Sequence, residues 1–358
     1  MMPGEPRSLR IAVVAPGQLG EVGTGVAEAL DANGHRVFPV NSGSDWPVTV
    51  DLVVSFGPMA AMDDMLRHLK LIPEVVPVIF WYTEPLPSPS WPNRTIAASA
   101  GLHRVWRSSW RLLRRAGIDR AEALAQVGGR LRACSEMREL NRRGNLQLLA
   151  VFTRRHEQLF RAWDLPAVTI PMGYCPSFGH LMDLERDIDV AFVGSTRDKR
   201  RGPLVADLTR QLTAAGLRVV IKDGSPQHGY AFGAERTELL NRTKILLSIM
   251  RQPWDDPVFR TLLAAPNGAM VLSEPVRDSG PFVPGQHFIT TSLEQMVVTA
   301  KHYVQAEEER RSITQAAHQF VTRELTMVAM AERLLQAWQK RAIVDPQIES
   351  QDRRKNGQ

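Results

Sequence analysis

The sequence contains little cysteine: Cys134 and Cys175 are the only two in 358 residues. Two isolated cysteines exclude a disulfide framework and a cysteine-rich zinc site, and they favour a reducing compartment, so we expect a cytoplasmic protein. Long apolar runs are also missing, because a run such as residues 75–81 is far shorter than the roughly 20 residues that a membrane span needs. Residues 1–8 lack the apolar stretch of a secretory signal, so none is expected.

Two nucleotide-binding motifs are absent as well. After the strand expected at residues 9–15, the glycines Gly17, Gly20, Gly23 and Gly25 do not have the G-x-G-x-x-G spacing of dinucleotide-binding proteins. The sequence also has no G-x-x-x-x-G-K-[ST] loop, so we expect neither an NAD or FAD site nor a P-loop kinase. We interpret Gly17 and Gly20 as positions where an acceptor approaches the backbone closely, or alternatively as parts of a tight turn.

Apolar strands and helices alternate along the chain, and 44% of the residues are hydrophobic. A chain of this length and composition can bury two cores, which predicts two domains. The strands are so uniformly apolar that both sheets are expected to be parallel and covered on both faces. We therefore predict an α/β protein of two Rossmann-like parallel-sheet domains, residues 1–175 and 176–344, that face a cleft. Residues 345–358 are polar and are expected to form a disordered tail.

Positive charge is concentrated in one segment of a chain whose net charge is +6. Residues 94–132 hold nine arginines against Asp119 and Glu122, and Trp106 and Trp110 lie among these arginines at helical spacing. Such a segment is suited to contact with an anionic membrane surface or an anionic acceptor. The alternative is an amphipathic helix packed on its own domain. No nucleic-acid-binding motif accompanies the charge, so we expect no nucleic-acid partner.

The carboxyl half contains a strand, loop, helix and strand in succession. An apolar run at residues 244–250 leads into Asp256 and Pro257, which are suited to the start of a helix, and a second apolar run at residues 269–272 follows. Ligands of parallel sheets bind beyond the carboxyl ends of the strands and near helix N-termini. Four polar residues are therefore expected around one crevice: Arg251, Arg260, Ser273 and Glu274. The alternative is an ordinary ion pair between arginine and Glu274 at a helix end.

Three segments here, residues 259–261, 267–274 and 281–288, resemble the donor side of GT-B glycosyltransferases. Within that class they are most similar to the branch related to the spore-maturation (CgeB-like) proteins, and the resemblance extends over most of the carboxyl half. Residues 171–174, with the pattern Pro-x-Gly-Tyr, resemble the segment between the two domains of these enzymes. The resemblance implies a GT-B architecture and a nucleotide-diphosphate sugar as donor.

A second set of donor contacts is expected where the strand at residues 188–193 ends. Backbone amides from Gly194 to Thr196 and nearby cations are suited to cradle a diphosphate, and members of the family carry a Gly-Ser loop with basic residues here. Arg200 and Arg201 are alternatively solvated surface charges. The complete donor-binding set that we predict comprises Gly194, Ser195, Thr196, Arg197, Lys222, His228, Arg260, Ser273 and Glu274.

The ribose contact departs from the family pattern. Related GT-B families place a glutamate in the helix after the loop to hold the donor ribose, and Leu263 occupies that position here. Asp255 falls where those families have the first glutamate of a pair. We therefore predict that Glu274 contacts the ribose, and we leave the identity of the donor open.

The candidate general base is Glu84, which follows the apolar strand predicted at residues 75–82. A carboxylate in this place faces the ligand edge of a parallel sheet and is suited to accept a proton from an acceptor hydroxyl. The alternative is an exposed glutamate that begins a proline-rich loop. The predicted acceptor-side residues are Gly17, Gly20, Trp81 and Tyr82.

No metal site is expected. Asp187 and Asp189 match the Asp-x-Asp pattern of metal-dependent glycosyltransferases of the other major fold, but they lie at the start of a strand, on the edge opposite the ligand side, so we interpret them as structural. The charge of the leaving diphosphate would then be stabilised by helix N-termini together with Arg197, Lys222 and Arg260.

We therefore predict a metal-independent glycosyltransferase without a bound cofactor, whose partners are a nucleotide-sugar donor and an unidentified acceptor. Two other functions remain compatible with the sequence. One is a sugar-nucleotide epimerase or phosphorylase on the same architecture, and the other is a catalytically inactive module that binds anions or membrane surfaces. The stereochemistry of transfer also remains open.

Overall fold

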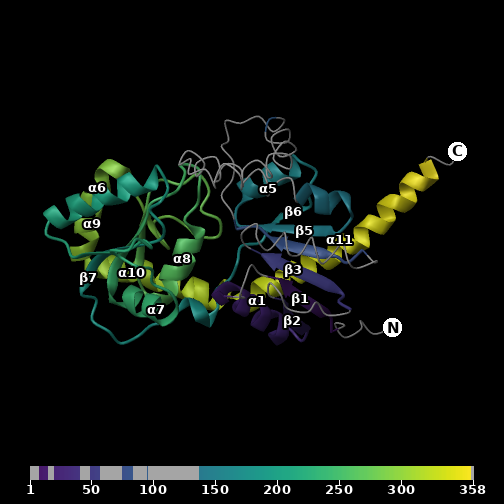
Figure 1. Cartoon of the computed structure of the whole chain (residues 1–358), viewed down its shortest axis with the longest axis horizontal. Coiled ribbons are helices and arrows are strands. Elements are labelled where there is room, and N and C mark those ends of the chain that lie inside the picture. Colours follow the sequence, from purple (N-terminus) through teal and green to yellow (C-terminus); the bar gives the residue numbers. More distant parts are fainter. Residues whose placement is uncertain are drawn as a thin grey trace, which may run out of the picture. The chain divides into compact units, whose positions relative to one another are not determined.

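The computed structural model describes residues 8–14, 20–40, 49–56, 75–83, 95 and 137–355. The chain divides into two compact units (Figure 1). The first contains Met1–Pro171 and Met330–Gln358, and the second contains Met172–Ala329. The chain therefore enters the second unit near the glycine- and proline-bearing connector at residues 172–179 and returns to the first unit at Met330.

The first unit is built on a parallel sheet with the strand order β2-β1-β3-β4-β5-β6. Every residue of β3 and β4 is buried, as expected for strands covered on both faces. The strands predicted in this half of the chain are thus confirmed. The elements of the unit are β1 (Arg10–Val14), α1 (Gly20–Ala32), β2 (Arg36–Val40), β3 (Leu52–Phe56), β4 (Val78–Trp81), β5 (Leu146–Val151), α5 (Arg154–Arg161) and β6 (Ala167–Thr169).

The second unit contains another parallel sheet, with the strand order β11-β10-β9-β7-β8. Two parallel α/β sheets confirm the predicted fold class. The strands and α-helices of this unit are β7 (Ile188–Val193), α6 (Arg201–Ala214), β8 (Val219–Lys222), α7 (Gly233–Arg242), β9 (Thr243–Ser248), α8 (Val258–Ala264), β10 (Met270–Ser273), β11 (Ile289–Thr290), α9 (Met296–Gln305) and α10 (Glu307–Gln319). Short turns are η1 (Pro176–Phe178), η2 (Ala265–Asn267), η3 (Leu293–Gln295) and the π-turn η4 (Phe320–Glu324).

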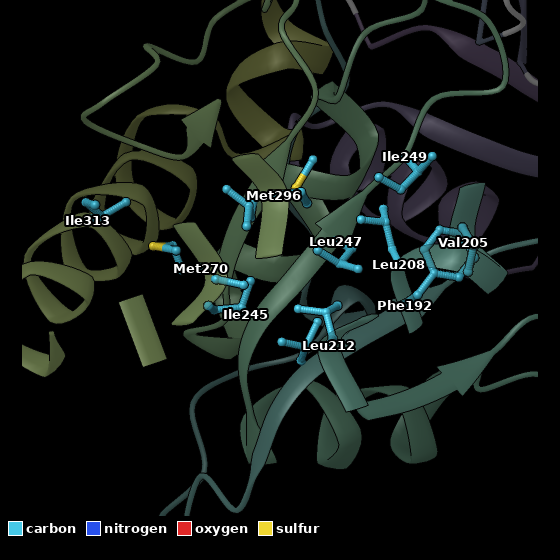
Figure 2. Packing of buried hydrophobic residues seen from close by; sticks show 13 residues of the cluster. Phe192, Val205, Leu208, Leu212, Ile245, Leu247, Ile249, Met270, Met296 and Ile313 are labelled. Carbon is cyan, nitrogen blue, oxygen red and sulfur yellow. The ribbon is translucent and has the colours of Figure 1, made fainter. Parts of the chain in front are cut away.

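One face of the second sheet packs against α6, α9 and α10 (Figure 2). Side chains alternate between the two faces of a strand, so Ile245 and Leu247 of β9 point to the same side as Phe192 of β7. Leu208 and Leu212 of α6 cover this face and are buried with them. Gly216, which follows α6 with a φ of +83°, adopts the left-handed conformation in which glycine commonly ends a helix.

Helix α11 (Met327–Lys355) begins at the end of the second unit and continues into the first. Met330, Leu334 and Leu335 on this helix are buried. The helix extends to Lys355, across most of the segment for which the sequence predicts a disordered tail. Among the described residues, no helix is both long enough and apolar enough to cross a membrane.

Candidate functional site

The carboxyl ends of four strands in the second sheet lie in one row. Ser248 of β9 is the register partner of Ser273 in β10, and Val193 of β7 is the partner of Lys222 in β8. Since β7 and β9 also pair in parallel, with Ala191 beside Leu246, these four residues end the strands at the same level. The loops that follow them therefore meet at one edge of the sheet, where parallel α/β folds bind ligands.

Arg260 on α8 lies against the loop that follows β7. Gly194 in that loop has a φ of +141°, and a Cβ atom on it would come within 2.9 Å of Arg260 Nη2. The guanidinium lies 5.0 Å from the centre of the Phe192 ring, and Nη1 donates to the carbonyl of Ile249 at 3.1 Å. Glycine at position 194 thus leaves the space that Arg260 fills.

Burial lowers the pKa of Arg260 to about 9, and repulsion from Arg201 and Arg251 adds to the shift. Asp255 and Glu274 offset part of this repulsion. Burial and the charge of Arg251 also lower the pKa of Arg201, whose guanidinium lies 5.9 Å from the same Phe192 ring. We call Arg201, Arg251 and Arg260 the guanidinium cluster, because their like charges act on one another at one edge of the sheet; Arg201 and Arg260 are held against Phe192, whereas Arg251 is exposed.

The start of α6 brings two more charged residues, Asp198 and Arg200, to this edge. Asp198 Oδ1 accepts hydrogen bonds from the backbone N–H groups of Arg200 and Arg201, and this fixes the first turn of the helix. The side chain of Arg201 donates to the carbonyl of Ser195. Arg200 and Arg201 are therefore parts of the loop structure, and the interpretation of both as solvated surface charges is wrong.

Glu274, the predicted ribose contact, is buried and paired with Arg200. The two nitrogens of the Arg200 guanidinium donate to the two carboxylate oxygens at 2.6 and 3.1 Å, and the backbone N–H of Met250 donates to Oε2 at 3.0 Å. Arg200 also donates to the carbonyl of Met250 at 2.9 Å. This network joins the ends of β9 and β10 to the start of α6, as the ion-pair alternative predicts, and the ribose contact stays a prediction.

A second polar network links the loops after β7 and β8 through Asp223. The Thr196 hydroxyl donates to Asp223 Oδ2 at 2.6 Å, and the Ser225 N–H donates to Oδ1 at 3.0 Å. His228 Nδ1 lies 3.2 Å from Asp223 Oδ1 and from the Ser225 hydroxyl. Burial raises the pKa of Asp223, but these hydrogen bonds outweigh burial and hold it well below its usual value. Thr196 and His228 are thus brought together, with half of the His228 side chain exposed.

Three predicted donor contacts lie apart from these networks. Lys222 Nζ pairs with Glu235 Oε1 at 2.8 Å, so its charge already has a partner. Ser273 is fully buried, and its hydroxyl faces the carbonyl of Ser248 at 3.5 Å. Arg197 is exposed, and no described residue forms an ion pair with it. Of these three side chains, only that of Arg197 is fully available to a ligand in solution.

Two of the predicted acceptor-side residues lie in the core of the first unit. Trp81 is fully buried and its Nε1–H donates to the carbonyl of Ile170 at 2.8 Å. Tyr82 is buried against Phe160, with ring centres 4.9 Å apart. Their large apolar surfaces stabilise the interior of the unit. The apolar pattern of the strand did not show whether these two side chains are buried or lie exposed at its end.

Of the remaining predicted positions, the structure describes some and leaves others out. Gly20 begins α1 with a φ of +55°, a conformation that favours glycine. Gly17, Glu84 and, apart from residue 95, the arginine-rich segment 94–132 lie outside the described residues. The predictions made for them stay predictions.

Asp187 and Asp189 lie at the opposite edge of the second sheet, where they pair with arginine and lysine side chains. Asp187 accepts hydrogen bonds from Arg218 and Arg242, and those from Arg242 contribute most to lowering its pKa to about 2. Asp189 pairs with Lys244 at 2.7 Å. Within the part of the chain that the structure describes, no three His, Cys, Asp or Glu side chains come together as a metal site would require.

Comparison with protein families gives a match over residues 188–336 to the family described as glycosyl transferase-like. The matched segment contains the guanidinium cluster, both polar networks and all of the second sheet. This part of the chain is therefore similar to that family. Comparison with curated proteins gives no match.

The chain as a whole has the fold of GT-B glycosyltransferases. HepE of Anabaena in complex with UDP-glucose is similar with a TM-score of 0.59 and 10% identity, over 93% of this chain and 100% of that one. A glycosyltransferase of Rickettsia africae gives 0.52 and 10%, over 94% and 99%. WaaG, a glycosyltransferase of lipopolysaccharide biosynthesis, gives 0.53 and 13%, over 90% and 98%. At such low identity the likeness shows the fold alone.

Proposed function

We propose that this protein transfers a sugar from a nucleotide-diphosphate sugar to an acceptor hydroxyl, and that it does so without a metal ion. The observation that carries the proposal is the guanidinium cluster at the Gly194 loop. Three positive charges are held there at the cost of mutual repulsion, and the pKa of Arg260 is lowered to about 9 by burial and by these neighbours. A bound diphosphate would relieve that repulsion, because each phosphate brings negative charge to the cluster.

The same charges are suited to the chemistry of transfer. When the bond between the sugar and the diphosphate breaks, negative charge grows on the leaving phosphate oxygens. Guanidinium groups already fixed by Phe192, Ser195 and Ile249 stabilise that charge without having to reorganise. In a metal-dependent enzyme a divalent cation supplies this stabilisation, and here we assign it to Arg201, Arg251 and Arg260.

The acceptor hydroxyl must lose a proton during an inverting transfer, and we propose Glu84 as the base that accepts it. The donor to test first is UDP-glucose, because the HepE structure contains that compound. We also propose kinship with the CgeB-like branch, on the strength of the segments at residues 259–261 and 267–274.

The decisive experiment measures release of free nucleoside diphosphate from a panel of nucleotide sugars and acceptors, with and without EDTA. Transfer releases one nucleoside diphosphate per glycosylated acceptor, and metal independence requires the rate to survive EDTA. An epimerase would convert the donor without releasing the nucleotide, and a binding module would leave it intact. Either result would contradict the proposal. A thermal-shift screen against nucleoside diphosphates identifies the nucleotide, because a ligand that binds the folded state raises the melting temperature.

A further inference from the structure

The second unit contains a cavity of about 770 Å³ that is separate from the guanidinium cluster. Arg186, which precedes β7, and Lys244, near the start of β9, both line it. The donor candidates follow the carboxyl ends of the same strands. Lys244 and Ser248 are four residues apart in β9, so at roughly 3.3 Å per residue the two edges are about 13 Å apart. The cavity therefore lies at the amino edge of the second sheet.

One face of helix α10 (Figure 1) forms a wall of this cavity. Glu307, Arg311, Thr314, Gln315 and His318 recur at intervals of three and four residues, which places them on the same side of the helix. Thr314 and Gln315 carry groups that can both donate and accept hydrogen bonds. The wall is thus polar along its whole length.

The charged residues of the lining are predominantly positive. Arg186, Lys244, Arg310 and Arg311 face the cavity together with only two carboxylates, Glu185 and Glu307. Lys244 pairs with Asp189 at 2.7 Å, and Arg311 pairs with Glu307 at 2.8 Å. Neither Arg186 nor Arg310 forms an ion pair with a carboxylate among the described residues, although the charges of Glu307 and Asp189 offset part of the Arg310 charge.

Arg186 is held in place by carbonyl groups alone. Its Nη1 donates to the carbonyls of Leu240 and Thr243 at 3.1 and 2.7 Å, and its Nη2 donates to that of Asn267 at 3.0 Å. A Cβ atom at Gly268 would come within 2.4 Å of Arg186 Nη2, so the glycine is required for this packing. Burial lowers the pKa of Arg186 to about 10, and the charge of Arg310 adds to the effect.

Arg310 is 7% exposed, and its Nη1 donates to the carbonyls of Tyr303 and Val304 at the end of α9. No described residue accepts a hydrogen bond from its Nε or Nη2. The end of a helix carries only about half an elementary negative charge, so these carbonyls offset part of the guanidinium charge. The remaining donors and the remaining charge are available to a ligand in the cavity.

We infer that this cavity binds a small phosphorylated molecule that also carries hydroxyl groups. Arginine pairs with phosphate through two parallel hydrogen bonds, and Arg186 and Arg310 supply two guanidinium groups that form no ion pair among the described residues. The cavity volume lies in the range of small-molecule sites, about 300–1,000 Å³. Thr314 and Gln315 are placed to bind hydroxyls. The inference does not rest on the proposed glycosyl transfer, since none of its residues belongs to the guanidinium cluster.

The test is calorimetric titration of the full chain with glucose 6-phosphate, with inorganic pyrophosphate as a second probe and glucose as the uncharged control. We expect the phosphorylated probe to bind and glucose not to bind. Arg311→Met should weaken binding about tenfold, because it removes a positive charge from the lining and leaves the Glu307 carboxylate there without its partner, and Gln315→Trp should abolish it by filling the cavity. Neither substitution removes a buried partner, so both variants are expected to fold.

Arg210→Met is the matched control, because Arg210 is also an exposed helical arginine that pairs with an acidic residue in the preceding turn. Its affinity for glucose 6-phosphate should equal that of the wild type. Binding that persists in Arg260→Ala separates this cavity from the donor site. No binding of either phosphorylated probe at millimolar concentration, or equal weakening in Arg311→Met and Arg210→Met, would overturn the inference. Loss of binding in Arg260→Ala alone would assign the probe to the donor site and also overturn it.

Discussion

Arg260 carries its charge in surroundings that oppose it. Its guanidinium lies against Phe192, close to two other arginines, and one backbone carbonyl accepts a hydrogen bond from it. A buried charge without a full partner lowers the stability of the folded chain unless a ligand compensates it. These surroundings support the proposal that Arg260 binds an anionic ligand.

Replacing Arg260 by alanine should weaken the binding of UDP by about 1.5–3 kcal/mol, the range for a hydrogen bond to a charged group. Calorimetry measures the loss directly. Arg218→Ala is the control, because Arg218 pairs with Asp187 at the opposite edge of the sheet, and its affinity for UDP should not change. Unchanged affinity in a folded Arg260→Ala variant would contradict the role of the cluster.

Glu274 has two roles to distinguish, one in the ion pair with Arg200 and one in the predicted ribose contact. Glu274→Gln should lower the free energy of unfolding by about 1–3 kcal/mol, because it leaves the half-buried Arg200 without its counter-charge. If Glu274 also binds ribose, UDP affinity should fall more than pyrophosphate affinity. Arg200→Met is the comparison variant: equal losses for both ligands in both variants would leave Glu274 only the role of positioning Arg200.

Asp256 should make stability depend on pH. Burial raises its pKa to about 7, and the charges of Asp255 and Asp278 add to the effect. An unfolded aspartate titrates near pH 3.9, so between about pH 4 and pH 7 the folded chain binds more protons than the unfolded chain. The free energy of unfolding should therefore decrease as the pH rises through this window.

Asp256→Asn should remove that decrease and stabilise the protein at pH 8 relative to the wild type by an amount on the order of 1–3 kcal/mol. Asparagine retains an oxygen that can accept the hydrogen bond from the Val258 N–H. Urea unfolding at pH 5 and pH 8 measures the difference. The exposed Asp183→Asn variant is the control, and identical pH profiles for Asp256→Asn and the wild type would refute the prediction.

At the scale of elements, the loop after β7 depends on a backbone conformation that side chains rarely adopt. Gly194→Ala places a Cβ atom at a φ of +141° and within 2.9 Å of Arg260 Nη2. We expect a loss of about 1–3 kcal/mol in the free energy of unfolding and weaker binding of UDP, since Arg260 must move. Thermal unfolding and calorimetry measure the two effects.

Gly216→Ala separates the two effects, because Gly216 has a φ of +83° but no atom within 4 Å of its Cβ position. It should lose stability through backbone strain while keeping its affinity for UDP. If both glycine variants bind UDP as the wild type does, the Gly194 loop has no part in binding the donor.

Strands and their order of appearance were readable from the sequence, because a strand buried on both faces must be apolar along its length. The helix after Asp256 was also predicted, although the structure starts it at Val258. An ion pair of Glu274 with an arginine was one of the two interpretations, but Arg200 was not identified as the partner, because 74 residues separate them in the sequence. The burial of Trp81 was missed because strand alternation does not apply when both faces are covered.

For the whole molecule, transfer requires a donor held by one part of the chain and a base that acts on the acceptor. If Glu84 is that base, Glu84→Gln should keep UDP affinity and lower the rate of the chemical step by about 10²–10⁴, because an amide does not accept the proton. The acidic limb of the pH–rate profile should disappear with it. Single-turnover kinetics measures the step, and full activity in Glu84→Gln would remove this residue from the mechanism.

The return of α11 to the first unit has a consequence for biosynthesis. The first unit consists of Met1–Pro171 and Met330–Gln358, so a ribosome must complete the second unit before it delivers the last piece of the first. Until then, the buried side chains of Met330 and Leu334 are missing from the first unit. The amino-terminal part of the first unit should therefore be more prone to aggregation until translation of the second unit is finished.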